Sequence, residues 1–224
     1  MRSTKRTKSL FISHFFRYND AMIKHIIFDF GGVFLDLGEN KKVHYNLHKV
    51  FNISEEKALE IWKEHKEKLI VGTETPEEFL TRVAAILNHP ISASEVHELW
   101  KQVNKMKKES IDWPLVDYVE SLKKNYKIHM LSNAIDLDAG NAEWADLIDK
   151  HFDNIYKSFG IGHKKPSKEA FLHVLEKINA KPEECVFIDD LKVNIDVANE
   201  LGINGVLYTN LDQLEKDFSR FEIK

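Results

Sequence analysis

Short apolar runs alternate with helical patterns along the second half of this chain. The runs at 127–131, 185–188 and 205–208, and a weaker one at 154–156, are typical of buried β-strands. Helical patterns accompany them at about 114–124, 140–150, 167–178, 193–202 and 211–218. Because strands that alternate with helices form parallel sheets covered on both faces, we predict an α/β fold with a doubly wound parallel sheet.

One more strand is predicted well before this region, and a helical segment separates it from the others. The run 23–28 favours β structure and stops at Asp29 and a pair of glycines. Residues 38–112 contain no convincing strand, whereas Thr75 and Ser92 each begin the hydroxyl-to-acid spacing of a capping box. We therefore expect a helical insertion over 38–112 within an α/β core made of 22–37 and 113–224.

The charge balance argues against nucleic-acid binding. The chain has 32 basic and 36 acidic residues, a net charge of −4, and five of its basic residues lie in the first 21. The remainder is more acidic than the total, whereas affinity for nucleic acid depends on clustered Lys and Arg. The single cysteine, Cys185, has no partner for an internal disulfide, and the longest apolar run, 83–87, is too short to span a bilayer. We expect a cytoplasmic protein without a membrane segment.

The first 21 residues share only some features of a secretory signal. A basic start precedes an apolar stretch, but Ser13 and His14 interrupt that stretch and no cleavage pattern of small residues follows. We expect residues 1–21 to be a disordered or loosely docked basic extension, or translation to begin at Met22.

Polar residues follow three of the predicted strands at the point where ligands bind in open parallel sheets, beyond the carboxyl ends of the strands. Asp29 ends the first strand, Ser132 and Asn133 end the second, and Asp189 and Asp190 follow the run 185–188. A lysine-rich turn that contains Lys165 leads into the helix at 167–178. We expect these side chains to converge at one edge of the sheet.

The chemistry of this set suits a phosphate group and a metal ion. Three carboxylates at one edge repel one another unless a cation lies among them, and hard oxygen ligands suit Mg²⁺. The Lys165 ammonium and the polar groups of Ser132 and Asn133 are suited to phosphate oxygens. Asp29 is a candidate nucleophile that could carry a phosphoryl group as an aspartyl phosphate.

In these residues the chain resembles the haloacid dehalogenase superfamily. The segment Asp29–Val33 is similar to its first motif, Met130–Asn133 to its second, Lys164–Pro166 to its third and Val186–Asn194 to its fourth. The helical insertion is similar to the family's C1 cap, which closes over small substrates.

The resemblance implies a role for each matching residue. Asp29 would be the nucleophile, and Mg²⁺ would be held by Asp29, Asp190 and the carbonyl of Gly31, with Asp189 a ligand through water or a supporting carboxylate. The phosphoryl oxygens would be bound by Ser132, Asn133 and Lys165. The substrate implied is a small phosphorylated metabolite.

Gly31 departs from the usual phosphatase pattern, which has a general acid two residues after the nucleophile. Three consequences are open: a substrate with a good leaving group, such as a sugar 1-phosphate, a substitute residue or water, or weak activity. Family members with glycine at this position and the same cap type include sugar 1-phosphate phosphatases. The alternatives are a 2-haloacid dehalogenase, which would have no use for the carboxylate pair, and a catalytically weak phosphate-binding regulatory protein.

Overall fold

A computed structural model describes residues 22–35, 44–90, 92, 94, 95, 98, 110–135 and 148–224. The predicted extension at 1–21 and most of the helix predicted at 140–150 lie outside the described residues. In the described part of the chain, the helices are all too short or too polar to cross a membrane.

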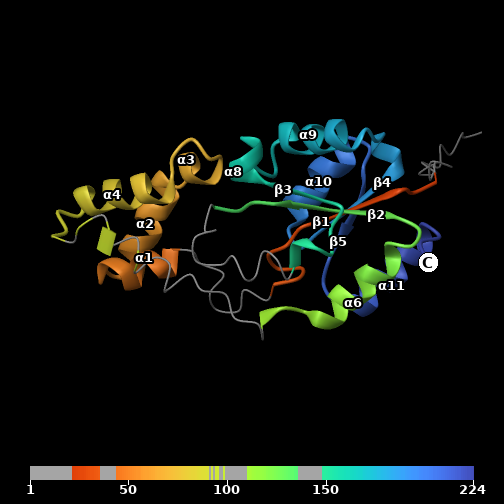
Figure 1. The fold of residues 1–224 in the computed structure, drawn as a ribbon, viewed down its shortest axis with the longest axis horizontal. Coiled ribbons are helices and arrows are strands. Elements are labelled where there is room, and N and C mark those ends of the chain that lie inside the picture. The colour runs from red at the N-terminus through yellow and green to blue at the C-terminus, as the bar shows by residue number, and fades with distance from the viewer. Residues whose placement is uncertain are drawn as a thin grey trace, which may run out of the picture.

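Five parallel strands form the sheet in the order β3-β2-β1-β4-β5 (Figure 1). They are β1 (His25–Phe28), β2 (Lys127–Ser132), β3 (Asn154–Lys157), β4 (Cys185–Asp189) and β5 (Asn204–Leu207). The predicted doubly wound parallel sheet is confirmed, and each predicted strand is present to within a residue or two. The order places β1 at the centre, because the chain adds strands first on one side of β1 and then on the other.

Helices cover both faces of this sheet, with α9 and α10 on one side and α6 and α11 on the other (Figure 1). Their bounds are α6 (Trp113–Leu122), α8 (Ser158–Ile161), α9 (Lys168–Ile178), α10 (Lys192–Glu200) and α11 (Leu211–Arg220), with the 3-10 turn η3 (Pro182–Glu184) before β4. Successive residues of β1 point to opposite faces: Ile26 and Phe28 join the core beneath α6 and α11, and Ile27 joins the core beneath α9 and α10. This two-sided burial explains why the strands appear as unbroken apolar runs.

The helices α1 (His44–Phe51), α2 (Glu55–His65), α3 (Glu67–Ile70) and α4 (Pro76–Ile86) lie to one side of the sheet and have an apolar core of their own (Figure 1). The predicted capping box of α4 is confirmed: the Glu78 N–H donates to the Thr75 hydroxyl at 3.2 Å, and the Thr75 N–H donates to the Glu78 carboxylate at 2.8 Å. Phe79 and Val83 are buried in that core, whereas Ile86 is 48% exposed.

The chain leaves the sheet and returns to it at the same place. Leu35 forms an isolated antiparallel bridge with Ile111, and the Asp112 N–H donates to the Phe34 carbonyl at 2.9 Å. The four helices therefore belong to an insertion whose two ends lie side by side next to β1. A second contact joins them to the core where α3 meets α8.

Candidate active site

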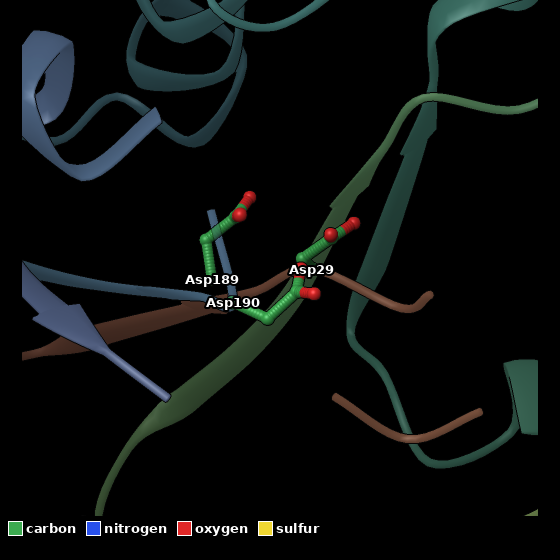
Figure 2. A group of neighbouring side chains, drawn as sticks. All are labelled: Asp29, Asp189 and Asp190. Atoms are coloured by element: carbon green, nitrogen blue, oxygen red, sulfur yellow. The ribbon is translucent and has the colours of Figure 1, made fainter. Parts of the chain in front are cut away.

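Asp29, Asp189 and Asp190 lie together at the carboxyl edge of β1 and β4 (Figure 2). The parallel register pairs Phe28 with Ile188, so the residues that follow each strand are neighbours in space. The Asp29 N–H continues the ladder by donating to the Ile188 carbonyl at 2.8 Å. One oxygen from each of the three carboxylates lies within 4.8 Å of the others. The polar residues at these strand ends therefore converge, as the sequence predicts.

Lys165 lies between two of these carboxylates. Its Nζ is 2.7 Å from Asp29 Oδ1 and 2.7 Å from Asp189 Oδ2, and its side chain is 1% exposed. The ammonium also lies over the Phe187 ring, 5.3 Å from the centroid. A buried ammonium is stable only when it is paired, and here both partners come from strand ends of the central sheet.

The Asp189 carboxylate is saturated by donors. Asn194 Nδ2 donates to both of its oxygens at 2.9 Å, the Leu191 N–H donates to Oδ1 at 2.8 Å, and Lys165 occupies Oδ2. With its side chain 0% exposed, Asp189 holds Lys165 in place. This arrangement favours the supporting role that the sequence left open for Asp189.

Asp29 is also buried, and burial raises the pKa of its carboxyl to about 6. Lys165 opposes this rise in pKa by favouring the charged form, while the Asp189 carboxylate adds to it. Besides Lys165, Asp29 has two carboxylates close to it, those of Asp189 and Asp190. A bound cation would therefore favour ionised Asp29, the form that a nucleophile requires.

Ser132 is the last residue of β2, and Asn133 directly follows it. Ser132 is buried, with 7% of the residue exposed. Its hydroxyl lies at the carboxyl end of a central strand, where ligands bind in parallel sheets, which makes it a candidate to bind a ligand oxygen. The Asn133 side chain, in contrast, accepts from the Lys165 N–H and donates to the Lys165 carbonyl, both at 2.8 Å. It thus fixes the backbone of the lysine that reaches Asp29.

The two glycines after Phe30 form the other wall of the site. Gly32 has φ +85°, and a Cβ placed on it would lie 2.4 Å from Asp190 Oδ2. Glycine is therefore required at position 32 by both the backbone conformation and the space beside Asp190. At position 31 glycine offers only its backbone to the site, so its carbonyl remains a predicted ligand.

The donor set fits Mg²⁺. The ion prefers hard oxygen ligands and uses one or two carboxylates together with waters and phosphate oxygens. Asp29 and Asp190 supply two carboxylates at the strand edge, within reach of one ion. Asp189 is committed to its donors, so it would support the site by holding Lys165.

Three residues important to this geometry had no role in the sequence interpretation. Asn194 lies within the fourth motif, on the first turn of α10, where its amide reaches back to Asp189. In the sequence, Gly32 is only the second of two glycines after the first predicted strand. Ser158 follows β3, and the strand-end rule that identified Asp29 and Asp189 points to it when the weaker run at 154–156 is included.

Comparison with known proteins agrees with this geometry. A family profile described as hydrolase, haloacid dehalogenase-like hydrolase, matches residues 23–202. The D-ribitol-5-phosphate phosphatase of Bacteroides thetaiotaomicron is 28% identical over 191 residues, which cover 81% of this chain and 89% of that protein. The similarity therefore includes both the sheet and the inserted helices.

Solved structures have the same fold. A haloacid dehalogenase family enzyme from Bacteroides thetaiotaomicron, in complex with magnesium and inorganic phosphate, superposes with a TM-score of 0.64 at 26% identity, covering 84% of this chain and 94% of that one. A predicted haloacid dehalogenase-like hydrolase from Porphyromonas gingivalis gives a TM-score of 0.69 at 24% identity, covering 91% of this chain and all of that one.

Proposed function

This chain belongs to the haloacid dehalogenase-like hydrolase family, and from that premise we propose that it is a Mg²⁺-dependent phosphatase of a small phosphorylated sugar or sugar alcohol. The observation that carries the proposal is Lys165, buried and bound to both Asp29 and Asp189 at the edge where Asp190 also lies. A relative that acts on D-ribitol 5-phosphate, and a similar structure with magnesium and phosphate, support it.

The proposed reaction has two displacements at phosphorus. An oxygen of the Asp29 carboxylate attacks the phosphoryl group, the bond from phosphorus to the substrate oxygen breaks, and the departing oxygen takes a proton from water. Water then attacks the aspartyl phosphate, which releases inorganic phosphate and restores Asp29. Such transfers depend mainly on alignment and on neutralisation of the phosphoryl charge.

The other side chains bind and align the phosphoryl group. Lys165 holds Asp29 in position and neutralises charge, and the Ser132 hydroxyl donates to a phosphoryl oxygen. Asp29, Asp190 and the Gly31 carbonyl would hold Mg²⁺, which supplies positive charge to the phosphoryl oxygens when bound. Asn194 and Asp189 keep Lys165 oriented.

Gly31 makes the leaving group the main question of specificity. A missing general acid typically costs about 10²–10⁴ in rate, and the loss is largest for a poorly acidic leaving group. A sugar 1-phosphate has the more acidic leaving group, whereas the relative's substrate, D-ribitol 5-phosphate, is the ester of a primary alcohol. Comparing kcat for these two ester types shows whether another group replaces the missing acid.

We also propose that residues 38–112 form a cap over the site. The described helices of this segment have their own core, and the bridge from Leu35 to Ile111 brings its two ends together. A helical lid excludes water and bulky partners, which favours small substrates.

The first test is phosphate release by the purified protein with Mg²⁺, using sugar phosphates and p-nitrophenyl phosphate. Asp29→Asn removes the nucleophile, so we expect activity to fall by roughly 10³-fold or more. Asp196→Asn is the control, because Asp196 is ion-paired with Lys192 on the exposed face of α10. Undiminished turnover by Asp29→Asn would refute the assignment.

A second assay separates the phosphatase from its alternatives. We expect EDTA to abolish phosphate release. We expect no chloride release from a 2-chloro acid, with or without EDTA. Chloride release that survives EDTA would instead identify a dehalogenase. Phosphate binding without turnover of any ester would identify a binding protein.

A further inference from the structure

Ser158 lies directly after β3 and is fully buried. Its Oγ accepts from the Ala134 N–H at 3.0 Å and donates to the Ala134 carbonyl at 2.9 Å. One hydroxyl therefore satisfies both backbone groups of a single loop residue, and its only hydrogen is used in doing so.

The register of the sheet explains this pairing. The ladder between β2 and β3 ends with Ser132 opposite Lys157, and beyond that pair both chains leave the sheet. The next residue after Lys157 begins α8, so its backbone turns away from β2. Its hydroxyl supplies the hydrogen bonds that a further strand residue would have made, and extends the ladder into the loop 133–135.

The same loop is fixed a second time through its first residue. Asn133 binds the N–H and carbonyl of Lys165, so residues 133 and 134 are tied to two points of the segment 158–165. Four hydrogen bonds thus join the end of β2 to the segment that carries Lys165. Ser132, at the end of β2, and Lys165, in the turn between α8 and α9, are therefore held by one connected set of hydrogen bonds.

We propose that Ser158 is a positioning residue for the phosphate site, which fixes the loop 133–135 so that the Ser132 hydroxyl and the Lys165 ammonium stay aligned on Asp29. The inference rests on the proposed function and deepens it. Ser158 is buried and its hydroxyl is committed to Ala134, so it acts through this loop and not by contact with substrate.

Removal of the hydroxyl should loosen the loop. In Ser158→Ala the Ala134 N–H loses its acceptor and the Ala134 carbonyl loses its donor, so the loop must move to bind water or another polar group. The expected consequence is a rise of about fivefold to thirtyfold in KM and in the inhibition constant of inorganic phosphate, because one backbone pair is disrupted. Ser158→Cys keeps a weak donor and acceptor and should give a smaller change in the same direction.

The experiment measures hydrogen exchange of the loop amides together with kinetics on p-nitrophenyl phosphate in Mg²⁺. We expect faster exchange at Ala134, higher KM and weaker phosphate inhibition in Ser158→Ala, with native circular dichroism. Val119→Ala is the matched control: it opens a cavity in the core beneath α6, so it should lower the melting temperature and leave KM unchanged.

Each outcome decides one point. Unchanged KM and phosphate inhibition in Ser158→Ala, despite faster exchange, would overturn the positioning role and leave Ser158 a structural residue. If Ser158→Ala does not fold, a wild-type KM in folded Ser158→Cys overturns it equally. If the wild type neither hydrolyses esters nor binds phosphate, the proposed function fails, and slow exchange at Ala134 in Ser158→Ala would then refute the loop contact separately.

Discussion

At the scale of single residues, the site depends on how closely backbone and carboxylate approach each other. Gly32 has a positive φ and lies against Asp190, the carboxylate least buried of the three. The position imposes two separate costs on any other residue: backbone strain at φ +85° and collision with a proposed metal ligand.

We expect Gly32→Ala to weaken activation by Mg²⁺. The added Cβ must displace Asp190, and disturbing the groups that orient a metal ligand typically costs about 10- to 100-fold in metal affinity. The measurement is phosphatase activity titrated with Mg²⁺.

Gly202→Ala controls for backbone strain. Gly202 has the same φ of +85°, but its Cβ would meet only Pro182 Cβ at 3.5 Å. If both variants require the same Mg²⁺ concentration as the wild type, the proposed contact of Gly32 with the metal site is wrong.

At the scale of elements, the contact between α3 and α8 joins the inserted helices to the segment that carries Lys165. Gly72 follows α3 with φ +73°, and a Cβ on it would lie 2.0 Å from the Phe159 carbonyl oxygen. Glu67 and Lys164 form an ion pair at 2.6 Å beside it. That pair is partly exposed and contributes little, so the backbone contact at Gly72 dominates.

Gly72→Ala should therefore separate α3 from α8. We expect a loss of about 1–3 kcal/mol in unfolding free energy from strain at positive φ, and more from the collision. If residues 38–112 form a cap, kcat/KM for a sugar phosphate should fall further than kcat/KM for p-nitrophenyl phosphate, which needs fewer cap contacts.

Gly160→Ala is the matched control within α8. A Cβ at Gly160 meets no atom within 4 Å, so stability and both kinetic constants should stay at wild-type values. Equal losses with both substrates in Gly72→Ala would indicate damage to the core and count against the cap.

At the scale of the whole molecule, a row of three hydrogen-bonded polar side chains, of which His129 is buried, crosses three strands toward the amino end of the sheet. Asn154 Nδ2 contacts His129 Nδ1 at 3.2 Å, and His129 Nε2 contacts His25 Nδ1 at 3.1 Å. Because the Asn154 amide donates to His129 Nδ1, that nitrogen carries no proton when His129 is neutral. The proton of neutral His129 is then on Nε2, and this N–H donates to His25 Nδ1. Both hydrogen bonds of this row can therefore form only while both imidazoles are neutral.

Because these hydrogen bonds need neutral imidazoles, we expect the protein to lose stability in acid. The pKa of His129 is lowered to about 4, chiefly by burial and also by His25 and Lys127, while Asp153 opposes the decrease. Since the folded state binds a proton less readily than the unfolded state, the stabilisation is complete above pH about 6.5 and is lost as the pH falls toward 4.

We expect the free energy of unfolding, measured in urea, to decrease across this pH range and to decrease less in His129→Gln. His163→Gln is the control, because His163 is exposed in the turn before Lys165. An equal pH dependence in His129→Gln and the wild type would exclude His129 as the source.

The sequence by itself determined the sheet and most of the site. Two-sided burial makes each strand an apolar run, and parallel strands bring their carboxyl ends to one edge, so Asp29, Asp189 and Lys165 could be placed together without coordinates. The family resemblance is confirmed by the profile over 23–202.

Only the tertiary structure decided how these residues divide their roles. Asp189 is saturated by Asn194 and Lys165, the Asn133 side chain holds the Lys165 backbone, and Ser158 completes the ladder at Ala134. Hydrogen bonds between residues far apart in the chain depend on distance and angle, which no local pattern encodes. Residue type and spacing brought the groups to one edge, and packing determined which of them hold one another and which are left to face a ligand.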